Sequence, residues 1–138
     1  MRSIEIDYSL YKGIKMPIIP VEIEGKNGWK KVWVFVDSGA TYSILHKDEA
    51  ERLEIDWRSK DMIMAVVGDG GSIPVYLHTL KLMIDNIQII AQIGFSDRLG
   101  IGFNLLGRKD IFESFKVCFD DKNKVISLFK WEEKCVQM

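Results

Sequence analysis

Hydrophobic residues recur in this sequence mainly at every second position, which is the spacing of a β-strand that buries one face. The segment 21–24 alternates apolar with acidic residues and leads to the pair Asn27-Gly28, which tolerates the positive φ of a tight hairpin turn. The segment 29–36 follows, and from Val32 onward it is apolar on both faces, as in a strand in the middle of a core. This part of the chain therefore predicts a β-hairpin.

The rest of the chain predicts further strands. They lie at 62–67, 73–84, 87–93, 115–119 and 125–129. Pro74 donates no ladder hydrogen bond, so the second of these should begin at a sheet edge or in a free hairpin. Good helix formers at 47–53 predict a short helix. We expect a mainly β fold in a single domain over residues 1–138. It should have seven or more mostly antiparallel strands in a closed or nearly closed barrel, with one or two short helices.

The composition narrows the classes of function. The chain has 138 residues, of which 47% are apolar, and a formal net charge of −1, so charge gives no support for a nucleic-acid partner. No apolar run approaches the roughly 20 residues that span a bilayer, and the N-terminus lacks a signal-peptide pattern, so we expect a cytoplasmic protein with no membrane partner. Cys118 and Cys135 are too few for a disulfide framework, and His46 and His78 form no ligand spacing with them, so no metal site is expected.

One carboxylate stands in an unusual place. The stretch VFVDSGATYSIL, residues 34–45, sets Asp37 between two hydrophobic segments, on a turn of small residues. Desolvating a carboxylate there costs several kcal/mol or raises its pKa. Two interpretations follow from the residues alone. Asp37 caps its own backbone, as Asp-Ser-Gly does readily, or it is held there for its chemistry.

Three motifs in order resemble those of a known family. Asp37-Ser38-Gly39-Ala40 resembles the active-site loop of aspartic proteases. The segment 104–112, which contains Leu-Leu-Gly-Arg about 70 residues later, is similar to the one that opens the C-terminal helix of retroviral-type proteases. The glycine-rich segment 68–71 lies between them, where that family has its flap. The resemblance covers roughly residues 18–130 and is to the retropepsin-like family of single-domain, homodimeric aspartic proteases.

The resemblance implies a barrel of the acid-protease type, a peptide or protein substrate, and a role for each matching residue. Asp37 would be catalytic, and the small turn residues after it would support its loop. Leu-Leu would pack under that loop, and the glycine after it would begin a short surface helix. No metal or organic cofactor is implied. The supporting residues are Ser38, Gly39 and Ala40; the flap is Val67, Gly68, Asp69, Gly70 and Gly71; and the helix motif is Leu105, Leu106, Gly107 and Arg108.

The chemistry of such a site can be argued without the family. Peptide hydrolysis by water needs a base and an acid together, and two carboxyls about 3 Å apart provide both because the first charge opposes the second. At about 4 Å and an effective dielectric near 20 this repulsion is about 4 kcal/mol, which splits the two apparent pKa values by about three units. The sequence holds one Asp-Ser-Gly, so a homodimer is the economical source of the second carboxylate.

The sequence departs from the family pattern in two places. Many retroviral members have an acidic residue where this chain has Thr41, and that residue pairs with the arginine of the helix motif. Arg108 therefore lacks its usual partner. The replacements that the sequence offers are Asp48, Glu49 and Asp110. The second departure is a charged residue, Asp69, near the tip of the flap.

Two questions stay open at this stage. The ends, residues 1–17 and 131–138, have no clear match, although the termini of this family often build the dimer interface. A different class of function also fits the fold, namely a peptide-binding or oligomerisation module that does no hydrolysis. Binding of a statine-type transition-state mimic distinguishes the two classes, because it needs the carboxyl pair as well as the groove.

Overall fold

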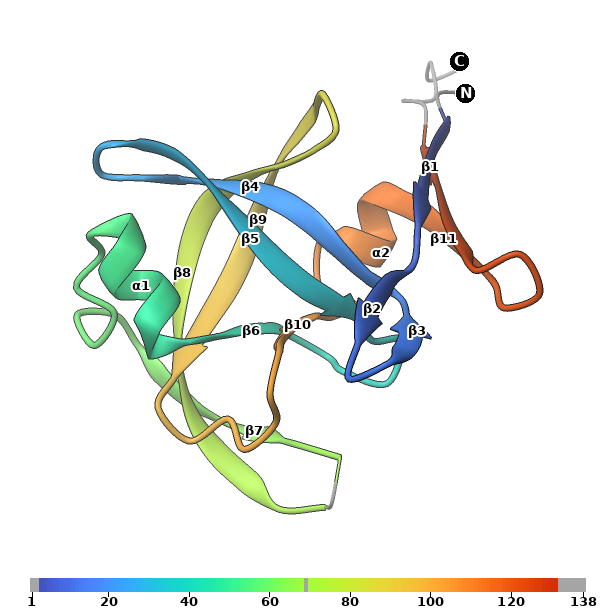
Figure 1. The fold of residues 1–138 in the computed structure, drawn as a ribbon. Helices are drawn as coiled ribbons and strands as arrows, with labels where there is room; N and C mark the ends of the chain where they lie inside the picture. The colour runs from blue at the N-terminus through green and yellow to red at the C-terminus, as the bar shows by residue number, and fades with distance from the viewer. Residues whose placement is uncertain (1–2, 69, 132–138) are drawn as a thin grey trace, which may run out of the picture.

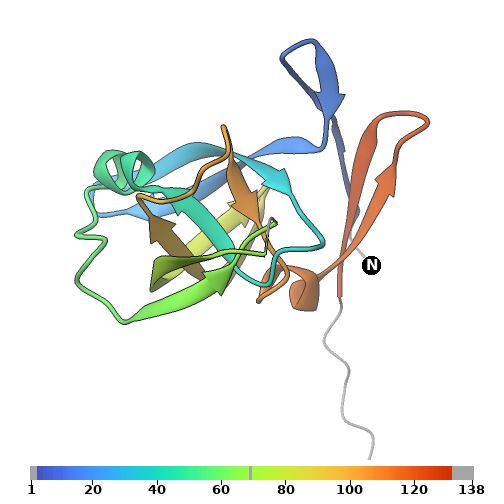
Figure 2. The same cartoon turned by 90° about the horizontal axis from the view of Figure 1, so that it is seen from below.

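Neighbouring strands joined by tight turns make up most of the structure, which we describe from a computed structural model (Figures 1 and 2). The description covers residues 3–68 and 70–131. The strands are β1 (Ser3–Asp7), β2 (Ser9–Tyr11), β3 (Ile14–Met16), β4 (Ile18–Gly25), β5 (Gly28–Val36), β6 (Ser43–His46), β7 (Met62–Val66), β8 (Ser72–Ile84), β9 (Ile87–Ser96), β10 (Asn104–Leu106), β11 (Phe115–Asp120) and β12 (Val125–Lys130), and the helices are α1 (Lys47–Leu53) and α2 (Ile111–Ser114). The mainly β class is confirmed.

The largest sheet has the strand order β4-β5-β10-β6-β9-β8-β7. A further pairing between β4 and β8, with Glu22 opposite Met83 and Ile23 opposite Leu82, joins strands from the two sides of this sheet into a ring. This ring is visible in Figure 1. That the ring is a closed barrel stays a prediction.

Two pairings in this sheet are parallel, β5 with β10 and β6 with β9, while the others are antiparallel. The β5–β10 pairing sets Leu106 beside Val36, the last residue of β5. This pairing therefore sets residues 104–106, just before Gly107, beside residues 34–36, just before Asp37. Neither β6 nor β10 was predicted from the sequence, since both are too short to show a period.

Strand β5 differs from its prediction. Val32, Val34 and Val36 are buried, as a period of two requires, but Trp33 on the other face is 48% exposed. The prediction that this strand is buried on both faces is therefore wrong. The buried residues of β4 and β5 join the main core, where Ile19, Ile23 and Val34 are fully covered.

The other predicted elements agree closely with the structure. Helix α1 covers 47–53 as expected, and Ala50 and Leu53 are its buried residues. Among the described strands Pro74 pairs only with β7, because the β8–β9 ladder begins at Tyr76 opposite Phe95, so the prediction of a sheet edge or a free hairpin is confirmed. Neither of the described helices has the length and the apolar character that are needed to cross a membrane.

The two ends of the described chain meet in a second, three-stranded sheet with the order β1-β12-β11. The views in Figures 1 and 2 agree in placing this sheet to one side of the strand ring. Tyr8 links it to the β11–β12 turn, because its hydroxyl donates to Asp121 at 2.6 Å and its amide donates to the carbonyl of Lys124 at 2.8 Å. Strands β2 and β3 form a separate hairpin.

Candidate active site

Asp37 follows the last residue of β5 and begins a tight turn. Its amide donates to the carbonyl of Leu106 at 2.9 Å, which anchors the turn to β10. The amide of Gly39 donates to Asp37 Oδ1 at 2.8 Å, and the amide of Ala40 donates to the Asp37 carbonyl at 3.2 Å. Asp37 is half-buried and Ser38 is exposed. The Gly39 bond is the one that a turn Asp makes to its own backbone, and it holds the carboxylate in a fixed direction.

The residues after the turn bind the Leu-Leu-Gly-Arg segment through the backbone. The Arg108 amide donates to the carbonyl of Ala40, and the Lys109 amide donates to that of Thr41, both at 2.8 Å. The Gly107 amide donates to Ser43 Oγ at 3.0 Å in a buried contact. The two sequence motifs therefore form one structural unit.

This unit explains the glycine at position 107. A Cβ added there would lie 2.3 Å from the carbonyl oxygen of Tyr42 and 2.8 Å from that of Ala40. Both contacts are with backbone, so no side chain can simply turn away. Leu106 before it is 1% exposed in the main core, and Leu105 is 7% exposed in a second apolar cluster that includes Ala40 and Ile44.

The expected helix begins later than predicted. Gly107 was expected to begin a surface helix, but it is buried, and α2 begins at Ile111. The amides of residues 107–109 donate to residues 40–43, which follow the Asp37 turn, and these bonds hold residues 107–109 beside that turn. Asp110 then takes a φ of 67° just before the helix, and its amide donates to Glu113 Oε1 at 3.2 Å, as in a capping box.

Arg108 also has a different partner from those that the sequence offered. Its guanidinium donates to the carbonyl of Ser38 at 3.2 Å and lies 5.5 Å from the centre of the Phe112 ring. Within the described chain it forms no ion pair with any of the three candidate carboxylates, which are Asp48, Glu49 and Asp110. Asp110 instead accepts from the Gln92 amide at 2.8 Å. Arg108 therefore supports the Asp37 turn through a backbone carbonyl.

A cavity of about 600 Å³ has Asp37 in its lining. Residues of the glycine-rich hairpin line it as well, namely Val67, Gly68 and Gly71. The turn of this hairpin is closed by the Val67 amide, which donates to the Gly71 carbonyl at 2.9 Å, and Gly70 has a φ of 85° that favours glycine. Asp69, the predicted charge near the tip, lies outside the described residues. The fold thus brings Asp37 and the predicted flap segment to one cavity.

The third part of the lining is a loop that the sequence analysis missed. Residues 97–103 connect β9 to β10, and Arg98, Leu99, Ile101 and Phe103 from this loop line the cavity. In Figure 1 the loop lies near the β7–β8 hairpin. The only sequence signal for it was its place directly before Leu-Leu-Gly-Arg. Phe103 stacks on Phe35 of β5 with 4.8 Å between the ring centres, which ties the loop to the strand that carries Asp37.

The comparison with protein families decides the assignment. The chain matches the family model described as aspartyl protease over residues 19–90, more than half of its length. The chain belongs to the aspartyl protease family. The matched span includes Asp37 and the hairpin of residues 67–71, and it ends before the segment around Gly107. No curated protein matches this aspartyl protease family member in sequence.

Solved structures show that this member of the family has a retropepsin-like fold. A retropepsin-like aspartic protease from Rickettsia conorii is 20% identical with a TM-score of 0.66, over 92% of this chain and 91% of that one. The EIAV protease, solved with the inhibitor HBY-793, is 24% identical with a TM-score of 0.53, over 76% and 92%. The retroviral protease-like domain of Ddi1 from Leishmania major is 19% identical with a TM-score of 0.56, over 89% and 99%.

Proposed function

We propose that this chain is an aspartic endopeptidase whose active site forms when two copies pair with their Asp37 carboxyls side by side. The observation that carries the proposal is the cavity in which Asp37, the β7–β8 turn and the loop 97–103 meet. A polypeptide in extended form fits such a place, because a strand can be added beside a hairpin while alternate side chains enter pockets.

The second carboxylate comes from a second chain in this proposal. The sequence has one Asp-Ser-Gly, and a two-fold axis beside the turn supplies its equivalent. Ser38 is exposed next to Asp37, which supports a contact between it and the same turn of the partner in this proposal. A Cβ at Gly39 would meet only Asp37 Oδ1, at 3.3 Å, among the described atoms, so this glycine leaves room for a second backbone.

Proton transfer then follows from the shared charge of the pair. The ionised carboxylate removes a proton from water, and the water oxygen forms a bond to the carbonyl carbon of the peptide. The protonated carboxyl donates its proton to the carbonyl oxygen. When the C–N bond breaks, the amine nitrogen takes up a proton from the pair, and one hydroxyl of the intermediate returns a proton to the pair, which leaves the carboxylic acid product and restores the shared proton. In this proposal the β7–β8 hairpin closes over the substrate and excludes bulk water during these steps.

A cleavage assay with three proteins tests the proposal. Wild type, Asp37→Asn and Asp85→Asn are incubated at micromolar concentration with a diverse peptide mixture from pH 3 to 8. Asp85 is the matched control because it lies in the β8–β9 turn, outside the lining of the Asp37 cavity. We expect discrete cuts from wild type and Asp85→Asn and none from Asp37→Asn.

Two other results would count against the proposal. Equal cutting by Asp37→Asn shows that another protease in the preparation is responsible. No cutting by any variant, from protein shown to be dimeric, favours the peptide-binding or oligomerisation module instead. Dimerisation has to be measured in the same solution, because a weak dimer is dissociated and inactive when dilute.

A further inference from the structure

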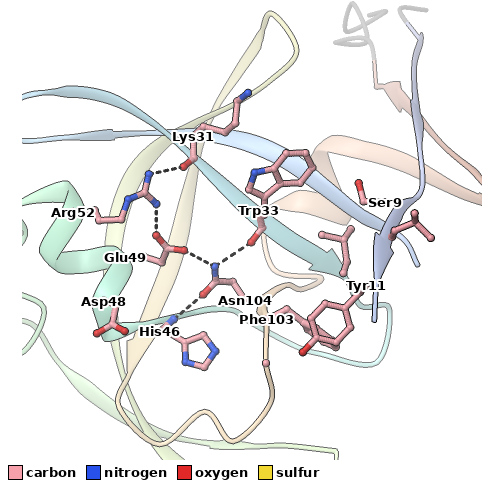
Figure 3. A pocket seen from close by; sticks show the side chains of 13 residues that line it. Ser9, Tyr11, Lys31, Trp33, His46, Asp48, Glu49, Arg52, Phe103 and Asn104 are labelled. Carbon is pink, nitrogen blue, oxygen red and sulfur yellow. Dashed lines mark hydrogen bonds and ion pairs between the residues drawn. The ribbon is translucent and has the colours of Figure 1, made fainter. Parts of the chain in front are cut away.

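A second cavity, of about 780 Å³, borders the same strand as the Asp37 cavity (Figure 3). Trp33 of β5 lines it, whereas Asp37 follows the end of β5 and lines the other cavity. Side chains two positions apart on a strand share a face, so Trp33, Phe35 and Asp37 follow one another along one side of β5 and its end. Phe35 therefore lies between the two cavities. We refer to the second one as the Trp33 cavity.

Phe103 covers Phe35 and forms a wall between the two cavities. Its ring stacks on that of Phe35, with 4.8 Å between the ring centres and 19° between the planes. Phe103 is in the lining of both cavities. A side chain in a shared wall affects the width of both spaces. The position of the Phe103 ring therefore decides how much room is left beside Asp37.

Tyr11 of β2 holds Phe103 from the side of the Trp33 cavity. The two rings meet edge to face, with 5.2 Å between their centres and 79° between their planes, and Figure 3 shows them at one end of this cavity. Tyr11 is not among the described residues that line the Asp37 cavity. Phe103 is thus held by the stacked ring of Phe35 and by the Tyr11 ring, in two arrangements that aromatic pairs prefer.

The Tyr11 hydroxyl also lies against the backbone of Gly102. A Cβ added at this position would collide with the Tyr11 oxygen, so the missing side chain at residue 102 lets the Tyr11 ring lie where it does. Gly102 lines the Trp33 cavity and is absent from the described lining of the Asp37 cavity. Tyr11 therefore contacts two successive residues, Gly102 and Phe103, from outside the proposed active site.

The loop 97–103 depends on side-chain contacts of this kind. Residues 99–102 form no hydrogen bond through their backbone with another described residue. The ion pair between Arg58 and Asp97, at 2.9 Å, holds only the first residue of the loop. Tyr11 is thus placed to fix the other end of the loop, where it reaches the Asp37 cavity.

The hairpin β2–β3 that carries Tyr11 is itself tied to the strand before Asp37. The Val36 amide donates to the carbonyl of Pro17, just after β3, at 2.9 Å. A two-stranded hairpin is at best marginally stable alone, so this hairpin relies on the contacts at its base and at Tyr11. It therefore connects the end of β5 to the loop on the other side of the cavity.

We propose that Tyr11 is a positioning residue that determines which substrate side chains fit beside Asp37. It acts through Phe103, because its ring keeps Phe103 in the wall of the Asp37 cavity and out of the Trp33 cavity. Without the Tyr11 ring, Phe103 can turn into the Trp33 cavity, and the space beside Asp37 becomes wider. The effect on cleavage rests on the proposed function, whereas the effect on the position of Phe103 does not.

Competition between peptides tests the effect on cleavage. A peptide that wild type cuts is synthesised with Leu or with Trp next to the cut bond, and both analogues are cleaved in one solution. The ratio of their kcat/KM values does not depend on how much active dimer is present, so a variant that is only less stable leaves it unchanged. We expect Tyr11→Ala to raise cleavage of the Trp analogue relative to the Leu analogue by about fivefold or more, since the pocket is wider.

Three further variants make the test specific. Tyr11→Phe keeps the ring and should keep the wild-type ratio. Gly102→Ala keeps Tyr11 but displaces its ring, so the ratio should change in the same direction as in Tyr11→Ala, and this variant decides the test if Tyr11→Ala does not fold. Leu10→Ala is the matched control, because Leu10 precedes Tyr11 in β2, is 70% exposed and is absent from the described lining of the Asp37 cavity. An unchanged ratio in Tyr11→Ala, or an equal change in Leu10→Ala, would overturn the proposal.

NMR of the full chain without substrate separates this result from that of the proposed function. The stacked rings of Phe103 and Phe35 should give nuclear Overhauser contacts in wild type and in Leu10→Ala, and we expect these to be lost in Tyr11→Ala. Their loss in a protein that cuts no peptide leaves the role of Tyr11 in positioning Phe103 intact and rejects only the catalytic proposal. Cleavage by wild type, with the same contacts and the same peptide ratio in Tyr11→Ala, rejects only the role of Tyr11.

Discussion

The amide of Gly107 donates to the hydroxyl of Ser43 in a buried contact between residues 64 positions apart in the sequence. Ser43 is 1% exposed and begins β6, just after the turn that carries Asp37. The bond therefore fixes the end of β10 to the segment that leaves the turn. Because Asp37 itself is bonded to Leu106, its position depends on a part of the chain that is remote in sequence.

Replacement of Gly107 by alanine should destabilise the protein by about 1–3 kcal/mol, the usual cost of overpacking. The added Cβ meets the carbonyls of Tyr42 and Ala40, and these are backbone atoms in the same turn. Urea unfolding measures the change. Gly100→Ala is the matched control, because a Cβ there meets none of the described atoms within 4 Å, and it should unfold like wild type. Equal stability of the two variants would show that the turn has room to move.

Replacement of Ser43 by alanine tests the hydrogen bond without adding bulk. The Gly107 N–H loses its acceptor in a buried place, which costs about 1–3 kcal/mol. We expect this loss in urea unfolding, together with slower peptide cleavage because the Asp37 turn is held less firmly. Ser3→Ala, at an exposed position of β1, should change neither quantity. A Ser43→Ala protein as stable as wild type would mean that another group accepts the bond.

Alkaline pH should destabilise the protein through Tyr8. Burial first, and then the hydrogen bond to Asp121, raise the pKa of Tyr8 from 10.0 to about 12. The folded state holds the phenol proton more tightly than the unfolded state does. The resulting stabilisation is complete below pH 10 and is lost as the pH rises from 10 towards 12.

Unfolding measured at several pH values from 8 to about 12 checks this expectation. Tyr8→Phe should be less stable than wild type by about 1 kcal/mol near neutral pH, since it lacks the hydrogen bond. Its stability should fall less steeply than that of wild type above pH 10. Tyr76→Phe removes a phenol that packs on Trp57, and it should keep the steep fall. Parallel curves for Tyr8→Phe and wild type would contradict the assignment to Tyr8.

Local sequence patterns were sufficient for the elements that neighbouring residues determine. The hairpin over 115–130, helix α1 and the edge position of Pro74 follow from apolar spacing, helix propensity and the missing amide of proline. The Asp37 turn and the glycine-rich hairpin were also found, because small residues mark such turns. Each of these features depends on residues close together in the chain.

The parts that were missed depend on contacts between distant residues. Loop 97–103 has no regular spacing, and it reaches the Asp37 cavity only because β5 pairs with β10. Helix α2 was predicted to begin at Gly107 but begins at Ile111. The amides of the residues before it are bound to the turn around Ala40. Trp33 looked like a core residue because its strand is apolar on both faces. Trp33 is exposed because the face of β5 that carries it borders a cavity and not the core.

The proposed pairing of two Asp37 residues makes a quantitative prediction for mixed dimers. Asp37→Asn chains are added to a fixed amount of wild type, and subunits are allowed to exchange before cleavage is measured. With random pairing in a tight dimer, an equal amount of variant leaves about half of the wild-type chains paired with each other, and a ninefold excess leaves about a tenth. We expect cleavage to fall in the same proportions.

The matched control in this experiment is Asp85→Asn, which keeps the Asp37 turn and should not lower cleavage when it is added. At concentrations below the dissociation constant of the dimer, wild type alone should show a rate that rises with the square of its concentration, since only the dimer is active. Cleavage that is unaffected by an excess of Asp37→Asn, and that stays proportional to the wild-type concentration, would mean that one chain carries the whole reaction. A second acid would then have to come from elsewhere in the same chain.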